Sequence, residues 1–168
     1  KYRRHVLMLH PHTVIVYDEL EASEAVRWEW LLHSPTEFKM DATKKTLSTN
    51  NKTKGWVAVT QLFGGHVFTL SQTDRFVVPP AITGAEYPNQ WHLTARVDGC
   101  SATRFLAIIQ VGDEAVSIIN RDGDTFNVGD WTVKAVLDAS KAPELTVSHR
   151  TEQAVFSLSL IHISEPTR

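Results

Sequence analysis

Cysteine, long hydrophobic runs and an excess of one charge are all lacking in this sequence of 168 residues. The one cysteine, Cys100, can form neither a disulfide within the chain nor a cysteine-based zinc site. No run of about 18 apolar residues is present to span a bilayer as a helix. The 17 basic and 19 acidic side chains leave a net charge of −2, which provides no basic field for nucleic acid. We therefore expect one domain held together by packing, with neither nucleic acid nor a membrane as a partner.

The two ends of the chain carry further expectations. The sequence starts at Lys1 without a signal-peptide pattern and enters an apolar run at once, which predicts a domain truncated at its N-terminus. Residues 158–168 (LSLIHISEPTR) resemble the in-frame translation of a transposase adapter used in sequencing libraries. We expect this tail to be non-native and the domain itself to occupy residues 1–157.

The chain is rich in short apolar runs with many β-branched residues, separated by turn residues such as Gly64-Gly65, Asp98-Gly99 and Asp122-Gly123. These runs predict strands at 3–10, 13–20, 55–63, 66–70, 90–97, 103–111, 115–120, 131–137 and 144–149. About ten strands at this spacing predict an all-β fold, an antiparallel two-layer β-sandwich.

The pattern inside the runs predicts which strands are buried. Residues 90–97 alternate apolar and polar side chains, as in a strand with one solvated face, whereas 103–111 are apolar on both faces and predict a central, covered strand. Residues 18–34 are ambiguous, because Ser23 and Glu24 suit a helix start while Val26, Trp28, Trp30 and Leu32 alternate as in a strand. We predict a turn followed by a strand.

Two of these runs carry a resemblance to a known family. VIVYDELEA (residues 14–22) and WEWLLHS (residues 28–34) resemble the signature strands of the heparinase II/III-like polysaccharide lyases. The later NQWHLTARV and TRFLAIIQV are similar to the strands that follow in that family, so the resemblance covers most of residues 3–111. It implies an α/α-toroid domain upstream and a supersandwich-like β domain of which this chain is the C-terminal portion.

The resemblance also implies a reaction. Such enzymes act in the periplasm or outside the cell on uronate-containing polysaccharides, such as glycosaminoglycans or alginate, and cleave them by β-elimination. This chemistry needs a donor or cation to neutralise the uronate carboxylate, a base to take the α-proton and an acid for the leaving oxygen. In the family, the catalytic Asn, His and Tyr residues and the His/Asp/His zinc ligands precede the segment present here. The resemblance therefore implies a scaffold and cleft wall with no catalytic residue and no cofactor of its own, although zinc or calcium could serve the parent enzyme.

Three residues are candidates for contact with an acidic polysaccharide substrate: His33, Trp56 and Trp131. Trp56 and Trp131 each adjoin a turn, and a flat indole can cover the C–H face of a sugar ring. His33 ends a strand and could hold or protonate a substrate, or satisfy its hydrogen bonds within the protein. The other tryptophans, Trp28, Trp30 and Trp91, lie on apolar strand faces and are expected in the core.

Other motifs have a structural interpretation beside the functional one. The His10-Pro11-His12 spacing could gather with His33 around a metal if three strands run up, down and up, but a proline turn with polar flanks explains it better. Asp122-Gly123-Asp124 starts like a calcium loop, yet lacks the later ligands and predicts a hairpin turn.

Two patterns fall in polar loops. Residues 51–53 (Asn-Lys-Thr) fit a glycosylation acceptor, and the lysines at 44, 45, 52 and 54 could attract a polyanionic glycan or form a solvated loop. The function hypotheses are thus three: part of a polysaccharide lyase, a non-catalytic carbohydrate-binding β-sandwich module, and a structural or adhesion module.

Overall fold

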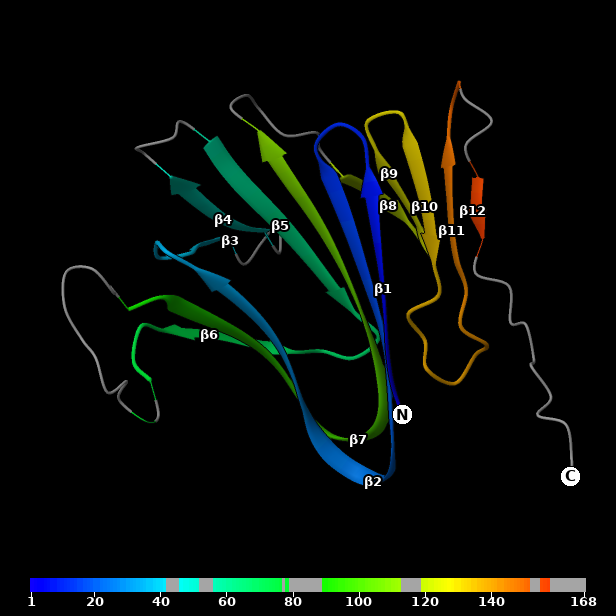
Figure 1. Ribbon diagram of the computed structural model, residues 1–168. Helices are drawn as coiled ribbons and strands as arrows, with labels where there is room; N and C mark the ends of the chain where they lie inside the picture. Colours follow the sequence, from blue (N-terminus) through cyan, green and yellow to red (C-terminus); the bar gives the residue numbers. More distant parts are fainter. Residues whose placement is uncertain are drawn as a thin grey trace, which may run out of the picture.

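The computed structural model of the chain describes residues 1–41, 46–51, 56–76, 78, 89–112, 119–151 and 155–157. The strands are β1 (Tyr2–Leu9), β2 (Thr13–Ser34), β3 (Lys39–Asp41), β4 (Thr46–Asn51), β5 (Trp56–Gly64), β6 (Thr69–Thr73), β7 (Trp91–Gly112), β8 (Ile119–Asp122), β9 (Thr125–Val128), β10 (Trp131–Ala135), β11 (Leu145–His149) and β12 (Val155–Ser157). They form two antiparallel sheets of seven and five strands (Figure 1). The described residues contain no helix, and so none that could cross a membrane. The all-β prediction is confirmed.

The seven-stranded sheet is built around two long strands. Its order is β1-β2-β7-β5-β4-β3. The short strand β6 pairs with residues 92–96 of β7, beyond the part of β7 that pairs with β5. Both β2 and β7 contain 22 residues and pair with each other from end to end. The predicted turn before the strand at 26–34 is therefore wrong, and so is the predicted break at Asp98-Gly99. Each is a bend inside one continuous strand.

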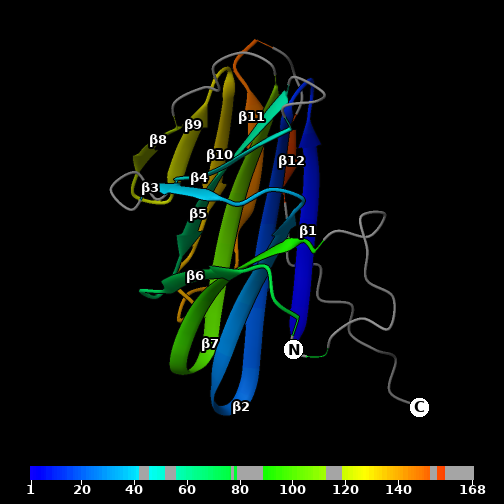
Figure 2. The ribbon, with the colours of Figure 1, turned by 90° about the vertical axis from the view of Figure 1, so that its left-hand side faces the viewer.

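The bend arises where the pairing of β2 and β7 changes register. The shift lies between Glu21 and Trp28, opposite Gly99 and Cys100 of β7. Extra residues in one strand of an antiparallel pair make a β-bulge, which bends the ribbon and increases its twist. Gly99 has a φ of +71°, a left-handed conformation that costs little only for glycine. Figures 1 and 2 both show the two strands turning back at this point. We call Thr13–Glu21 and Trp28–Ser34 the first and second arms of β2, and the segments of β7 that pair with them, residues 102–110 and 91–97, the first and second arms of β7.

The bend brings the second arms over one face of the first arms, and the space between them is filled by a hydrophobic core. Val16, Phe105 and Ala107 come from the first-arm layer, whereas Trp30, Leu93, Ala95 and Val97 come from the second-arm layer. Phe38, Leu47 and Leu62 complete the cluster. The expected core positions of the tryptophans are confirmed: Trp30 is 4% exposed, and Trp28 and Trp91 pack against this core.

A second core lies on the opposite face of the first arms, against the five-stranded sheet. That sheet has the order β12-β11-β10-β9-β8. Tyr17, Leu106 and Ile108 meet Phe126 and Val133 in this core. Because alternate residues of β7 enter alternate cores, residues 103–108 are all buried. The predicted central strand, covered on both faces, is confirmed.

A buried joint fastens the two sheets together beside this second core. The Tyr17 hydroxyl donates to the Val136 carbonyl at 2.7 Å. The Arg104 guanidinium, on a residue only 6% exposed, donates to the carbonyls of Val136, Asp138 and Lys141 at 3.1, 2.9 and 2.6 Å. Gly65 donates its N–H to the Arg104 carbonyl and lies against Leu137. These three residues therefore hold the β10–β11 connection on the seven-stranded sheet.

The Tyr17 hydroxyl makes a testable contribution to this joint. Burial is the largest cause that raises the pKa of Tyr17, to about 12 from the ordinary 10.0. A raised pKa favours folding below pH 10.0, and this contribution is lost as the pH rises toward about 12. We expect Tyr17→Phe to cost about 1 kcal/mol of unfolding free energy at neutral pH. Ultraviolet titration should show a late-ionising phenol that Tyr17→Phe removes; an unchanged titration curve would contradict the assignment.

The strands predicted at 3–10, 55–63, 131–137 and 144–149 are confirmed in position, with shifts at their ends. The hairpin of β1 and β2 pairs Leu9 with Thr13, as the runs at 3–10 and 13–20 predict. The turn at Asp122-Gly123 joins β8 to β9 and confirms the hairpin interpretation. The run predicted at 66–70 is displaced, because β6 starts only at Thr69. The segment predicted at 115–120 lies outside the described residues up to 118.

Candidate functional site

A cavity of about 390 Å³ opens in the bend of β2 and is the candidate site. Its walls come from β1 and from both arms of β2, because the bend places the second arm across the face that Arg4 and Asp18 share. The lining residues are Tyr2, Arg4, Asp18, Leu20, Trp28, Glu29, Trp30 and Leu31. We call this the bend cavity.

An ion pair forms one wall of the bend cavity. Arg4 and Asp18 are directly opposite each other in the β1–β2 hairpin. The guanidinium donates from Nε to Oδ1 at 2.7 Å and from Nη2 to Oδ2 at 2.8 Å, a two-point geometry that fixes both side chains. The hydrogen bond to Asp18 is the main cause that raises the pKa of Arg4, so the group remains a cation. Its Nη1 takes no part in this two-point pairing.

The opposite face of the same hairpin carries a separate charged cluster. Glu19 is 4% exposed and lies 3.5 Å from Lys1 Nζ, 3.8 Å from Arg3 Nη1 and 3.1 Å from His5 Nε2. Side chains of a strand alternate between faces, so Arg3 and Arg4 are adjacent in sequence but serve different surfaces. Arg3 is therefore a matched control for Arg4.

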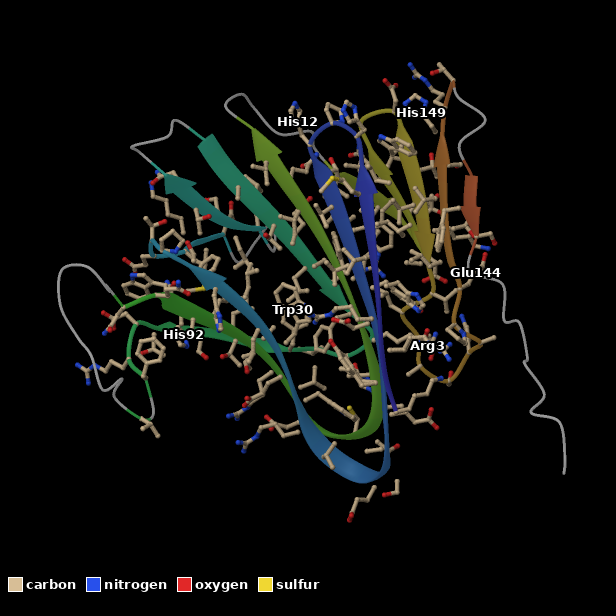
Figure 3. The ribbon with its side chains drawn as sticks, in the orientation of Figure 1. Arg3, His12, Trp30, His92, Glu144 and His149 are labelled. Atoms are coloured by element: carbon tan, nitrogen blue, oxygen red, sulfur yellow. The ribbon has the colours of Figure 1, made fainter. Side chains whose placement is uncertain are left out.

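Two indoles form the other wall of the bend cavity. Trp28 is half-buried, and its Nε1 donates to the Cys100 carbonyl at 3.0 Å across the bend. Trp30 lies between the two arms of β2 (Figure 3), and its Nε1 has no hydrogen-bond partner among the described residues. Tyr2 is 62% exposed at the rim, and the Arg4 guanidinium lies 5.7 Å from the centre of its ring. The cavity thus combines aromatic surface with a fixed cation, a combination suited to sugar rings and their hydroxyls.

A second cavity, of about 560 Å³, lies beside the β5–β6 connection. It is lined by Met40, Gly64, Gly65, His66, Val67, Phe68 and Leu70. His66 is hydrogen-bonded to Thr103 at 3.1 Å through its Nδ1. Since its lining is otherwise apolar and holds no carboxylate or permanent cation, it offers less polar recognition than the bend cavity.

The structure does not bring the three predicted substrate-contact residues together. His33 ends the second arm of β2, opposite His92 of β7. Trp131 begins β10 in the other sheet, half-buried against the inter-sheet core and 4.6 Å from the His149 ring, measured between ring centres. Trp56 is the first residue of β5, and its side chain lies outside the described part of the chain. Contact of each of these residues with a substrate stays a prediction.

The possible gathering of His10, His12 and His33 is wrong. It assumed a turn within residues 18–34, whereas β2 runs through that region as one bent strand. His12 therefore lies beside the β1–β2 hairpin turn, at the end of the molecule where Figure 3 also labels His149, and His33 lies a whole strand away. Within the described residues, no three His, Cys, Asp or Glu side chains converge as metal ligands.

Other predicted features stay local or outside the described residues. Cys100 is half-buried, and burial raises the pKa of its thiol, which favours the protonated form. The lysines at 44, 45, 52 and 54, and with them most of the 51–53 acceptor pattern, lie outside the residues that the structure describes.

Sequence reasoning missed Arg4 and Asp18 and assigned Trp28 and Trp30 only to the core. A signal for the ion pair was present, since a hairpin that pairs Leu9 with Thr13 places Arg4 opposite Asp18. No comparable signal existed for the indoles, because their approach to Arg4 depends on the bend.

Comparison with known proteins adds no assignment. No protein-family model matches the chain, and no curated protein sequence is significantly similar to it.

Proposed function

We propose that the chain is the C-terminal β-sandwich part of a polysaccharide lyase of the heparinase II/III-like class. In this proposal, the two packed sheets are a supersandwich-like scaffold, and the bend cavity is part of the wall that contacts acidic polysaccharide. The bonds of the polymer are broken by β-elimination at groups that an upstream α/α-toroid domain and the early β region supply, outside the cytoplasm.

One observation carries the proposal: the two segments that resemble the family are the two arms of β2, and both line the bend cavity. Asp18 and Leu20 come from VIVYDELEA, and Trp28, Trp30 and Leu31 come from WEWLLHS. Both segments therefore line one cavity that holds a fixed cation, which supports a shared role for them in contact with acidic polysaccharide.

The chemistry of the bend cavity suits recognition better than catalysis. Arg4 is held by Asp18 and presents Nη1, which can donate to a sugar hydroxyl or to a uronate carboxylate. Tyr2 and Trp28 supply apolar faces for a pyranose ring. No histidine lines this cavity, and its one tyrosine, Tyr2, is exposed at the rim. A scaffold and contact role follows, with the base and acid elsewhere.

Binding of defined oligosaccharides to the full chain tests the proposal. We expect uronate oligosaccharides from alginate or a glycosaminoglycan to bind and to change tryptophan fluorescence, because Trp28 and Trp30 line the bend cavity. Arg4→Gln should weaken this binding by about tenfold, the effect of losing one charge-assisted hydrogen bond.

Arg3→Gln is the control, since Arg3 has a similar exposure, 48% against 42% for Arg4, but faces Glu19 instead of the cavity. Thermal unfolding of both variants separates lost binding from lost folding. Equal weakening by the two substitutions would contradict a role for the bend cavity, and cleavage by this chain alone would contradict the scaffold role.

The same titration separates the alternatives. Tighter binding of neutral than of acidic glycans would favour a free carbohydrate-binding module, and no binding of either would favour a structural or adhesion module. The lyase reaction is tested on a longer polypeptide that includes the upstream domain, by the ultraviolet absorbance of unsaturated uronate products.

A further inference from the structure

Two histidines meet where the second arm of β2 pairs with residues 91–97 of β7, and neither of them lines the bend cavity. His33 of β2 and His92 of β7 are directly opposite in the antiparallel pair, and their ring centres are 4.5 Å apart with the planes inclined by 40°. His33 is exposed and His92 is half-buried. Side chains at directly opposite positions point to the same side of the sheet, so both imidazoles are presented to solvent together.

The two imidazoles take part in ring packing but in no hydrogen bond among the described residues. No hydrogen bond or ion pair of His33 or His92 occurs within the part of the chain that the structure describes. The edge of Phe76 packs against the His92 ring, with 4.7 Å between ring centres and an interplanar angle of 80°. His92 is thus held in place by apolar contact, while no described residue hydrogen-bonds to the ring nitrogens of either histidine.

Two adjacent free imidazoles are a ligand set for borderline divalent metals. Neutral imidazole nitrogen binds Zn²⁺ at about 2.0–2.1 Å, which separates two tetrahedral ligand nitrogens by about 3.3 Å. Rings whose centres are 4.5 Å apart can place one nitrogen each at that separation. Carboxylate and carbonyl sites suit Mg²⁺ and Ca²⁺ instead, so an all-imidazole pair selects Zn²⁺, Ni²⁺ or Cu²⁺.

We propose that His33 and His92 form a two-histidine site for Zn²⁺ on the outer face of the β2–β7 ribbon. Water or an added ligand completes the coordination, because no third His, Cys, Asp or Glu joins the pair among the described residues. The site links β2 to β7 next to the last residue pair of the second arms, Ser34 and Trp91, which is the end farthest from the bend. It does not depend on the proposed function, since it shares no residue with the bend cavity.

Titration of the full chain with ZnCl₂, followed by calorimetry and by thermal unfolding, tests the site. We expect one Zn²⁺ per chain to bind at this pair and to raise the unfolding temperature, since a ligand that binds the folded state stabilises it by mass action.

His33→Gln and His92→Gln should each abolish both the binding and the thermal shift. Both positions lie outside the two cores, so we expect each variant to unfold without zinc at the temperature of the unchanged chain. That measurement checks that the variants fold. The double variant His10→Gln/His12→Gln is the control for the other closely spaced histidines and should bind as the unchanged chain does. Absence of Zn²⁺ binding, its survival in either single variant, or its loss in the control would overturn the proposal.

Discussion

Substitution of Gly65 by alanine is expected to destabilise the chain by about 3 kcal/mol or more. A Cβ at this position would lie 2.1 Å from the Leu137 carbonyl oxygen and 3.1 Å from the Leu137 carbonyl carbon. Both are backbone atoms, and neither segment can move away freely. Gly65 donates its N–H to the Arg104 carbonyl at 3.0 Å, and Leu137 is 2% exposed within the inter-sheet core. Relief of the clash therefore requires the two sheets to separate locally.

Urea denaturation measures this effect, and Gly64→Ala is the matched control. A Cβ on Gly64 would approach the Phe68 ring and the His66 carbonyl at 3.0 Å, and these belong to the neighbouring loop of the same sheet. A loop and a side chain can adjust by a few tenths of an ångström, so we expect a clearly smaller loss. An equal loss in the two variants would show that the Gly65–Leu137 contact does not fasten the sheets.

Replacement of Arg104 by methionine should also cost about 3 kcal/mol of unfolding free energy. The guanidinium is the donor for three carbonyls of residues 136–141, and hydrogen bonds from a charged group are worth more than neutral ones. Methionine has a similar length but no donor. Val136 would keep the hydroxyl of Tyr17, whereas the carbonyls of Asp138 and Lys141 would lose their Arg104 partner.

Two further variants make the Arg104 result specific. Arg104→Lys keeps the charge but not the planar fork that serves several carbonyls at once, so we expect an intermediate loss. Arg96→Met removes a cation from the same strand, but one that is 43% exposed and paired with Asp98, which limits the expected loss to about 0.5 kcal/mol. Denaturation midpoints in the order Arg96→Met, Arg104→Lys and Arg104→Met, from most to least stable, are expected. A loss at Arg104 no larger than at Arg96 would contradict the joint.

The joint and the bend cavity explain why β2 and β7 are so long. Each strand uses its first-arm part to contact the five-stranded sheet through residues such as Tyr17 and Arg104. The second arm of β2 turns back to close the bend cavity with Trp28 and Trp30. The first arms thus hold the two sheets together, and the second arm of β2 shapes the candidate site. We therefore expect substitutions in the joint to lower the free energy of unfolding more than they change ligand binding.

Local pattern was sufficient for most of the strands. The β-branched run at 13–20, the fully apolar run at 103–111 and the turn at Asp122-Gly123 correspond to structure because each depends on side chains close in sequence. Alternation also placed Trp28, Trp30 and Trp91 toward a core, because side chains of a strand alternate between its two faces whatever the strand pairs with.

Long-range features were beyond that reasoning. Ser23 and Glu24 suit a helix start and Gly99 suits a turn, and nothing local distinguishes a break that ends a strand from a bulge that bends one. That difference is decided by whether β2 and β7 pair again beyond the bulge, which involves residues about 70 positions apart in the chain. This renewed pairing of β2 and β7 places His33 beside His92, and it places Trp28 in the same cavity as Arg4 and Asp18.

The sequence by itself determined that this chain is all-β, where most strands lie and which of their faces are apolar, because propensity and alternation act over a few residues. Only the tertiary structure decided that two pairs of predicted strands are two continuous bent ones, and that the cation at Arg4 shares a cavity with indoles from beyond the bend. Those contacts depend on the register between distant segments. That register is set by the need to bury apolar side chains in two cores, one on each face of the same sheet.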